Sequence, residues 1–243
     1  KEWQFDEHVS AAGWLEHDAL LIASETGLWR FSLNDGSRKL VIALEADNPI
    51  TRSNDGRADP WGGFWIGTMG KNAEKHAGAI YRLYKGELRN LFPSITISNA
   101  ICFSPNRQFA YYTDTVTQLV MRQALEQQDG WPMGEEEVYL DLRSENLNPD
   151  GAVIDDGGNM WLAQWGASRI ACYSTDGQFI NAIEFDALQP SCPAFGGPEL
   201  STLFCTTAAV DLSAETLAQQ PSNGVTFLSE NASMGQSEHQ VIL

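Results

Sequence analysis

A turn rich in Gly, Asp, Asn or Pro runs directly into a short apolar segment at five places in this chain of 243 residues. The five copies are 16–26 (EHDALLIASET), 60–69 (PWGGFWIGTM), 105–114 (PNRQFAYYTD), 155–164 (DDGGNMWLAQ) and 196–207 (GGPELSTLFCTT). Their equivalent residues, Ile22, Ile66, Tyr112, Leu162 and Phe204, lie 44, 46, 50 and 42 residues apart. Short strands repeated at this period are typical of small sheets packed radially around an axis. The sequence therefore predicts an all-β fold, a β-propeller forming a single domain over residues 1–243, with its chemistry in the central channel.

Further strand patterns follow the repeats. Residues 27–33, 79–84 and 169–174 alternate between apolar and polar side chains, and a polar turn follows each of them, so we expect the next strand of each sheet there. Residues 117–128 have the composition of a helical turn but lie where a strand and its loop are due, and both alternatives stay open. Residues 70–78 and 213–221 are expected to be loops.

The five repeats do not account for the apolar segments at the C-terminal end, which bear on how the ring of sheets closes. Residues 225–229 and 241–243 are apolar and have no repeat of their own. A propeller leaves no exposed sheet edge when strands from both termini pair in one sheet. We therefore expect the C-terminal segments to take part in closing the ring.

Composition excludes several classes of partner. The formal net charge is −17 and is spread along the chain, while 43% of the residues are hydrophobic. This balance predicts a packed core under a solvated acidic surface, and it excludes nucleic acid and anionic membrane as partners. The four cysteines show no C-x-x-C spacing, and no segment reaches 18 continuous apolar residues. We therefore expect a cytoplasmic protein.

Polar residues interrupt the strand pattern at the same offset ahead of three repeats. The segments are 51–59 (TRSNDGRAD), 97–100 (ISNA) and 148–151 (NPDG). Because radial repetition brings equivalent positions to one level of the channel, Asn54, Asn99 and Asp150 are expected to converge there. Their oxygen atoms suit Ca²⁺, Mg²⁺ or Mn²⁺ better than a thiolate zinc site would. The alternative is that Asn-Asp-Gly and Pro-Asp-Gly are ordinary turn sequences.

These segments also resemble the ordered motifs of a known family. Four groups of residues follow one another along the chain: 52–60 (RSNDGRADP) with 67–69 (GTM), 97–99 (ISN) with Tyr112 and Asp114, 149–151 (PDG) with 155–161, and 191–197 with 203–204. In this order they resemble the signatures of the regucalcin/gluconolactonase family. The resemblance extends from about residue 10 to residue 229. It implies a six-bladed propeller that hydrolyses sugar lactones with one divalent cation (Ca, Zn, Mg or Mn).

The resemblance also implies roles for individual residues. Asn99 and Asp150 correspond to metal ligands, Asn54 to a residue near both metal and substrate, and Arg52 to a substrate-binding arginine. Asn72 takes the position of a substrate-contacting acid found in some relatives, so the sugar preference is expected to differ. The implied reaction is ester hydrolysis by a metal-activated water with Asp150 as general base.

One family motif is missing from the sequence. The remaining family metal ligand is a glutamate in a G-E-x-P motif near the N-terminus, and this chain contains no such motif. We therefore expect the first blade to be incomplete or absent here, through truncation, a gene fragment or a natural variant. This departure keeps open a calcium- or metabolite-binding propeller without turnover, and a propeller that serves only as an interaction scaffold.

Overall fold

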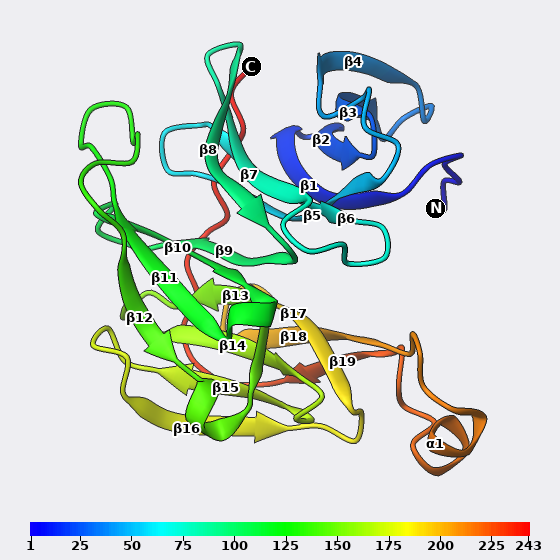
Figure 1. Cartoon of the computed structure of the whole chain (residues 1–243), viewed down its shortest axis with the longest axis vertical. Helices are drawn as coiled ribbons and strands as arrows, with labels where there is room; N and C mark the ends of the chain where they lie inside the picture. The colour runs from blue at the N-terminus through cyan, green and yellow to red at the C-terminus, as the bar shows by residue number, and fades with distance from the viewer.

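The computed structural model describes residues 1–243, and its strands form five antiparallel sheets. Four sheets have four strands and the fifth has three, and within every sheet the strands follow one another in chain order. Figure 1 shows the sheets arranged one after another around a common centre. The predicted all-β propeller is therefore confirmed, with five sheets built from these residues.

The first two sheets come from the N-terminal half of the chain. The first contains β1 (Val9–Glu16), β2 (Ala19–Ser24), β3 (Gly27–Ser32) and β4 (Arg38–Ala43). The second contains β5 (Thr51–Ala58), β6 (Phe64–Gly70), β7 (Gly78–Tyr84) and β8 (Glu87–Ile95).

The other three sheets follow in chain order. The third contains β9 (Ser98–Phe103), β10 (Phe109–Asp114), β11 (Leu119–Ala124) and β12 (Glu137–Asp141). The fourth contains β13 (Asn148–Ile154), β14 (Met160–Trp165), β15 (Arg169–Tyr173) and β16 (Phe179–Glu184). The fifth contains β17 (Gln189–Gly196), β18 (Thr202–Ala208) and β19 (Thr226–Ser229).

The repeated apolar segment is the second strand of every sheet. The five equivalent residues lie in β2, β6, β10, β14 and β18. The ambiguous segment 117–128 forms mainly the strand β11, preceded by a short 3₁₀-helix at Thr115–Thr117. The expected loop at 213–221 contains the helix α1 (Ala214–Gln219), which begins where the Ser213 hydroxyl accepts a hydrogen bond from Thr216 N. None of the helices has the length and apolar character needed to cross a membrane.

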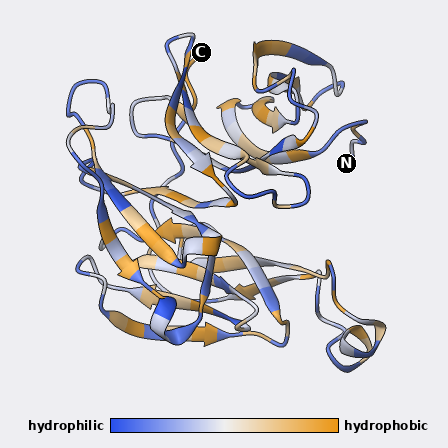
Figure 2. Cartoon of the chain, in the orientation of Figure 1, coloured by the Kyte–Doolittle hydropathy of each residue, from blue (hydrophilic) through white to orange (hydrophobic).

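The hydrophobic core consists of four layers, each between two neighbouring sheets. Leu21 and Phe64 pack between the first and second sheets. Trp65 packs against strands of the third sheet, and Trp161 packs with Phe195 of the fifth. Figure 2 shows hydrophobic residues within the strands and hydrophilic residues in many of the connecting loops. The two repeat tryptophans therefore join neighbouring sheets, because one face of each sheet needs the next sheet to bury it.

The innermost strands pack on one another in sequence, β1 on β5, β5 on β9, β9 on β13 and β13 on β17. Strands β17 and β1 are not packed in this way, and Figure 1 shows the ring open between the first and fifth sheets. The expectation that the C-terminal segments 225–229 and 241–243 supply strands that close the ring is wrong for these residues. β19 pairs with β18, and residues 241–243 form no strand. Val241 N and Ile242 N instead donate to Trp14 O and Gly62 O, which ties the C-terminal end to the first two sheets.

A buried ion pair holds the turn between β5 and β6. Arg82 Nε on β7 lies 2.7 Å from Asp59 Oδ2, and the two side chains are 0% and 1% exposed. Asp59 Oδ1 also accepts hydrogen bonds from the backbone N–H groups of Trp61 and Gly63. The guanidinium stacks over the rings of Tyr84 and Trp131. The carboxylate is therefore both a turn cap and the charge partner of a buried cation.

We predict that Asp59→Ala lowers the free energy of unfolding by about 3–5 kcal/mol, because it leaves the Arg82 charge buried without a partner. Glu87→Ala is the matched control, since it breaks the exposed Glu87–Arg89 pair in the same sheet and should cost no more than about 0.5 kcal/mol. Urea unfolding followed by tryptophan fluorescence measures both. Equal losses in the two variants would contradict this account of the ion pair.

Candidate functional site

Each of the five innermost strands has a β-bulge or register irregularity near its start. In β5 the pair Asn54–Asp55 lies opposite the single residue Gly67, and in β13 the pair Asp150–Gly151 lies opposite Ala163. In β9 the bulge comes directly after Asn99. β1 and β17 have their irregularities at Ser10 and Ser191. Because a bulge turns side chains away from the regular alternation, these irregularities place the polar residues of successive sheets at one level.

Close approach of neighbouring inner strands requires glycine at two of these positions. A Cβ on Gly67 would lie 2.1 Å from Ser98 Oγ, and a Cβ on Gly151 would lie 2.7 Å from Ser191 O and 2.9 Å from Cys192 Cα. Gly67 belongs to the G-T-M motif and Gly151 to the P-D-G motif. The two glycines therefore let the third and fifth sheets approach the bulges of the second and fourth.

A chain of hydrogen bonds connects the predicted residues across three sheets. Arg52 Nη1 donates to Asn54 Oδ1 over 2.8 Å, and Asn54 Nδ2 donates to Asn99 Oδ1 over 3.0 Å. Asn99 Nδ2 donates to Thr115 Oγ1 over 2.9 Å, and that hydroxyl donates to Pro149 O over 2.8 Å. The next residue after Pro149 is Asp150. The structure thus links Arg52, Asn54 and Asn99 directly, and it connects them to the bulge that carries Asp150.

The Asp150 carboxyl lies in a poorly solvated part of this site. Burial is the main reason why its pKa lies well above its ordinary value, and the negative charge of Asp55 raises that pKa further. Burial also raises the pKa of Asp55, against hydrogen bonds from Ile101 N and Gly56 N that favour its ionised form. No other side chain donates a hydrogen bond to Asp150, and the backbone N–H of Gly151 favours its ionised form.

The donor set fits a hard divalent cation. No group of three or more His, Cys, Asp or Glu side chains gathers to hold a metal ion, so a cation here would depend on amide oxygens together with one carboxylate. Asn54 Oδ1, Asn99 Oδ1 and the carboxyl of Asp150 are oxygen donors of the type that Ca²⁺ and Mg²⁺ prefer. The partly buried carboxyl of Asp150, which has no side-chain partner, is the observation that supports the fit.

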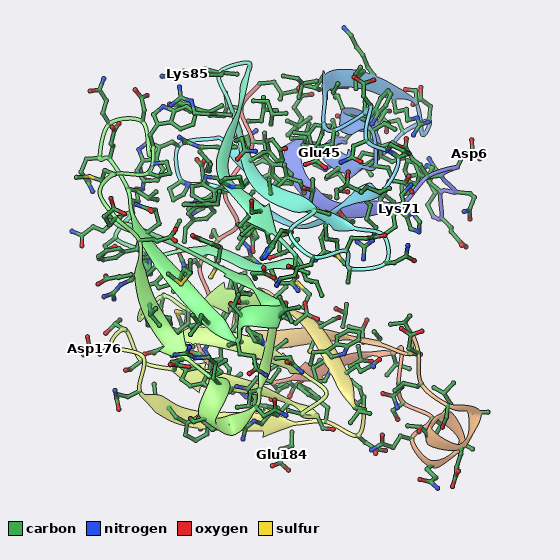
Figure 3. All side chains as sticks on the ribbon, in the orientation of Figure 1. Asp6, Glu45, Lys71, Lys85, Asp176 and Glu184 are labelled. Carbon is green, nitrogen blue, oxygen red and sulfur yellow. The ribbon has the colours of Figure 1, made fainter.

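A cluster of charged residues lies beside Arg52 at the start of the inner strands. Glu25, in the turn between β2 and β3, forms an ion pair with Lys71 Nζ at 2.6 Å and a short hydrogen bond with the His8 ring. Figure 3 labels Lys71 in the loop after β6. The negative charge of Glu25 also favours the charged form of Arg52, whose pKa is lowered by burial. The Glu25–Lys71 pair thus ties the first sheet to the second next to the arginine.

The side chains of Asn72, Asp114 and His76 lie apart from this hydrogen-bond chain. Asn72 is exposed in the loop 70–78, and its side chain and backbone N–H donate to Glu74. Asp114 accepts hydrogen bonds from Thr96 N and Ile97 N, so its carboxylate caps the turn between β8 and β9. The ring of His76 contacts Ser94 O. None of the three forms a hydrogen bond with Arg52, Asn54 or Asn99.

Three residues of this region, Thr115, Asp55 and Glu25, were not predicted from the sequence. Thr115 follows the Tyr112-x-Asp114 motif, and Asp55 is part of Asn-Asp-Gly, so both stood within motifs already noted. Glu25 lies in an ordinary polar turn of the first repeat. Only the packing of the first sheet on the second shows that its carboxylate reaches Lys71 and the vicinity of Arg52.

The comparisons with known proteins agree with the fold. The family model described as SMP-30/Gluconolactonase/LRE-like region matches residues 1–209. This chain therefore belongs to the SMP-30/gluconolactonase/LRE-like family.

Individual relatives match over most of the chain. The 6-deoxy-6-sulfogluconolactonase of Pseudomonas putida is 33% identical over 229 residues, which cover 92% of this chain and 77% of the relative. The L-arabinolactonase of Azospirillum brasilense is 32% identical over 223 residues, or 90% of this chain and 72% of the relative. The crystal structure of regucalcin from Agrobacterium tumefaciens, described as a calcium-binding protein, superposes with a TM-score of 0.97 at 38% identity. That superposition covers 99% of this chain and 82% of that one.

The charge cluster at Glu25 predicts a pH-dependent contribution to stability. Its hydrogen bond to Lys71 is the largest of several effects that lower the pKa of Glu25 from 4.5 to about 2. A carboxyl whose pKa is lower in the folded state stabilises that state above the unfolded pKa, and this contribution is lost as the pH falls toward the folded pKa. We predict that Glu25→Gln lowers the free energy of unfolding by about 1–2 kcal/mol at pH 7. The difference from wild type should shrink between pH 4.5 and pH 2.

Urea unfolding of both proteins over this pH range measures the effect. Glu16→Gln is the control, because Glu16 is largely exposed and pairs only with Arg30; it should change stability by less than about 0.5 kcal/mol. A Glu25→Gln difference that stays constant down to pH 2 would show that the charge of Glu25 has no part in stability.

Proposed function

We propose that this protein hydrolyses a sugar lactone with the help of one divalent cation. The observation that supports this most strongly is the chain of hydrogen bonds from Arg52 through Asn54 and Asn99 to the bulge of Asp150. It brings together oxygen donors, a carboxyl without a side-chain partner and a guanidinium within one family fold. Two relatives with more than 30% identity are named as lactonases.

The residues divide between holding a cation and handling the substrate. Asn54, Asn99 and Asp150 would hold the cation, which when bound supplies a Lewis acid for the lactone carbonyl and lowers the pKa of a water molecule. Ca²⁺, Mg²⁺, Mn²⁺ and Zn²⁺ are the ions to test, and the oxygen donors favour the first three. Arg52 contributes N–H donors for substrate hydroxyls or for the developing oxyanion.

Asp150 acts as the general base in this proposal. Its carboxylate takes a proton from water while the water oxygen bonds to the carbonyl carbon. The ring C–O bond then breaks, and the proton passes from Asp150 to the departing ring oxygen, which becomes a hydroxyl of the product acid. Asn54 connects Arg52 to Asn99 and thus fixes the guanidinium relative to the cation ligands. Asn72, at the exposed loop, is the proposed contact for a distal part of the sugar.

The setting of this reaction is the cytoplasm. The four cysteines are all free, and three of them are buried, an arrangement suited to a reducing compartment. The proposed partner is a small sugar lactone rather than nucleic acid or membrane, because the net charge of −17 repels anionic polymers and surfaces.

We predict that the purified protein opens an aldonolactone in a pH-stat assay and that EDTA removes the activity, which Ca²⁺, Mg²⁺ or Mn²⁺ then restores. Asp150→Asn should lower kcat by roughly a hundredfold or more, because it removes the general base. Asp176→Asn is the control, since Asp176 lies in an exposed turn after β15 (labelled in Figure 3) and should leave kcat unchanged. Activity that survives chelation would eliminate this mechanism.

The second candidate is a cation- or metabolite-binding propeller without turnover, which the calcium-binding description of the Agrobacterium structure favours. Titration calorimetry with Ca²⁺ on protein that does not hydrolyse lactones tests it. We expect Asn99→Ala to weaken the calorimetric Kd about tenfold or more, because it removes one of three proposed protein ligands. An unchanged Kd in this variant would place any bound cation elsewhere.

A further inference from the structure

The C-terminal segment 232–242, which we call the strap, crosses the ends of all five innermost strands. It leaves β19 and contacts each sheet in turn, as Figure 1 shows in red. Its hydrogen bonds connect Gly235 to Leu200, Met234 to Asp156, Gln236 to Ile154 and Phe103, Ile242 to Gly62, and Val241 to Trp14. The bulges lie toward the starts of these strands, so the strap covers the opposite end of the channel.

Two polar side chains of the strap face the channel. Gln236 Nε2 donates to Phe103 O and to Ile154 O, each over 3.0 Å, and so joins the ends of β9 and β13. Glu238 Oε1 pairs with Arg57 Nη1 on β5 over 2.7 Å. These residues line a cavity of about 20 Å³ together with Cys102, which is room for about one water molecule. The strap thus presents polar groups to the interior instead of only covering apolar surface.

Arg57 brings a positive charge close to the candidate cation site. It lies three residues beyond Asn54 on the same strand, or about 10 Å along it. Its side chain is 16% exposed, whereas that of Glu238 is 46% exposed. A guanidinium at this depth without a counter-charge would repel a divalent cation held by Asn54, Asn99 and Asp150.

We infer that the strap is a positioning element for the proposed cation site: Glu238 neutralises Arg57 and thereby keeps the channel favourable for a divalent cation. The inference rests on the proposed function, because it assumes a cation at Asn54, Asn99 and Asp150. Glu238 touches neither the substrate nor the cation and acts through Arg57. The C-terminal segment therefore tunes a site at the bulges, toward the other end of the channel.

The test uses two charge-removing variants with opposite expected effects. Glu238→Gln leaves Arg57 without its partner, so the calorimetric affinity for Ca²⁺ should fall about tenfold. Arg57→Gln removes the repelling charge, so the affinity should rise by a similar factor. A merely structural role for the pair would lower the affinity in both variants. Changes of the same sign, or no change in either variant, would overturn the inference.

Asp141→Asn and Arg143→Gln are the matched controls, since they remove the same charges from an exposed ion pair in the third sheet. Both should leave the Ca²⁺ affinity within about twofold of wild type, because screened surface charges act weakly at a distance. If wild-type protein binds no divalent cation, the proposed function fails, and with it the assumption on which this inference rests. If wild type binds Ca²⁺ but Glu238→Gln and Arg57→Gln change the affinity in the same direction, this inference fails while the proposed function stands.

A second measurement tests the ion pair without any cation. Thermal unfolding of the two single variants and of Arg57→Gln with Glu238→Gln forms a double-mutant cycle. Because Glu238 compensates a largely buried Arg57, Glu238→Gln should lower Tm in the wild-type background and much less when Arg57 is already replaced. Additive shifts in Tm would show that the two side chains are not coupled, which would also overturn the inference.

Discussion

The candidate site depends on one feature of the backbone, which is the bulge in each innermost strand. In a regular strand, successive side chains point to opposite faces, so residues such as Asn54 and Asp55 would be divided between the two sheet interfaces. Two residues opposite one partner break that alternation in β5, β9 and β13. The polar groups of three sheets can then face a common space without placing unpaired polar atoms in the apolar layers.

The bulges are held in place by contacts between sheets. Apolar layers fill each interface, and Gly67 and Gly151 allow the neighbouring inner strands to approach where any Cβ would collide. The carboxylate of Asp55 accepts hydrogen bonds from Ile101 N and Gly56 N, so it joins the bulge of β5 to that of β9. The same packing that stabilises the propeller therefore fixes the geometry of the polar residues.

Charged side chains lie at both ends of the channel, near the bulges and near the strap. Amide and hydroxyl groups connect Arg52 to the fourth sheet, while Asp55 and Asp150 bring two carboxyl groups into a poorly solvated region. At the far end, the strap supplies Glu238 opposite Arg57. Buried charges are tolerated when each has a partner or a ligand. Neither Asp55 nor Asp150 has a side-chain partner, but Asp55 accepts hydrogen bonds from two backbone N–H groups. Asp150 is the carboxyl that our proposal assigns to the cation.

The sequence by itself determined the class of fold and the strands that carry the candidate site. The regular spacing of five residues predicted the second strand of each sheet, because every sheet buries that strand in the same way. These residues are Ile22, Ile66, Tyr112, Leu162 and Phe204. The ordered motifs around Asn54, Asn99 and Asp150 indicated where the innermost strands lie. Ring closure was predicted wrongly, since the apolar segment 241–243 has the composition of a strand and yet packs as part of the strap. The roles of Glu25, Thr115 and Glu238 were decided only by the tertiary structure. Each of them acts through a partner on another sheet or on the strap, and a contact between segments distant in sequence leaves no local pattern to read.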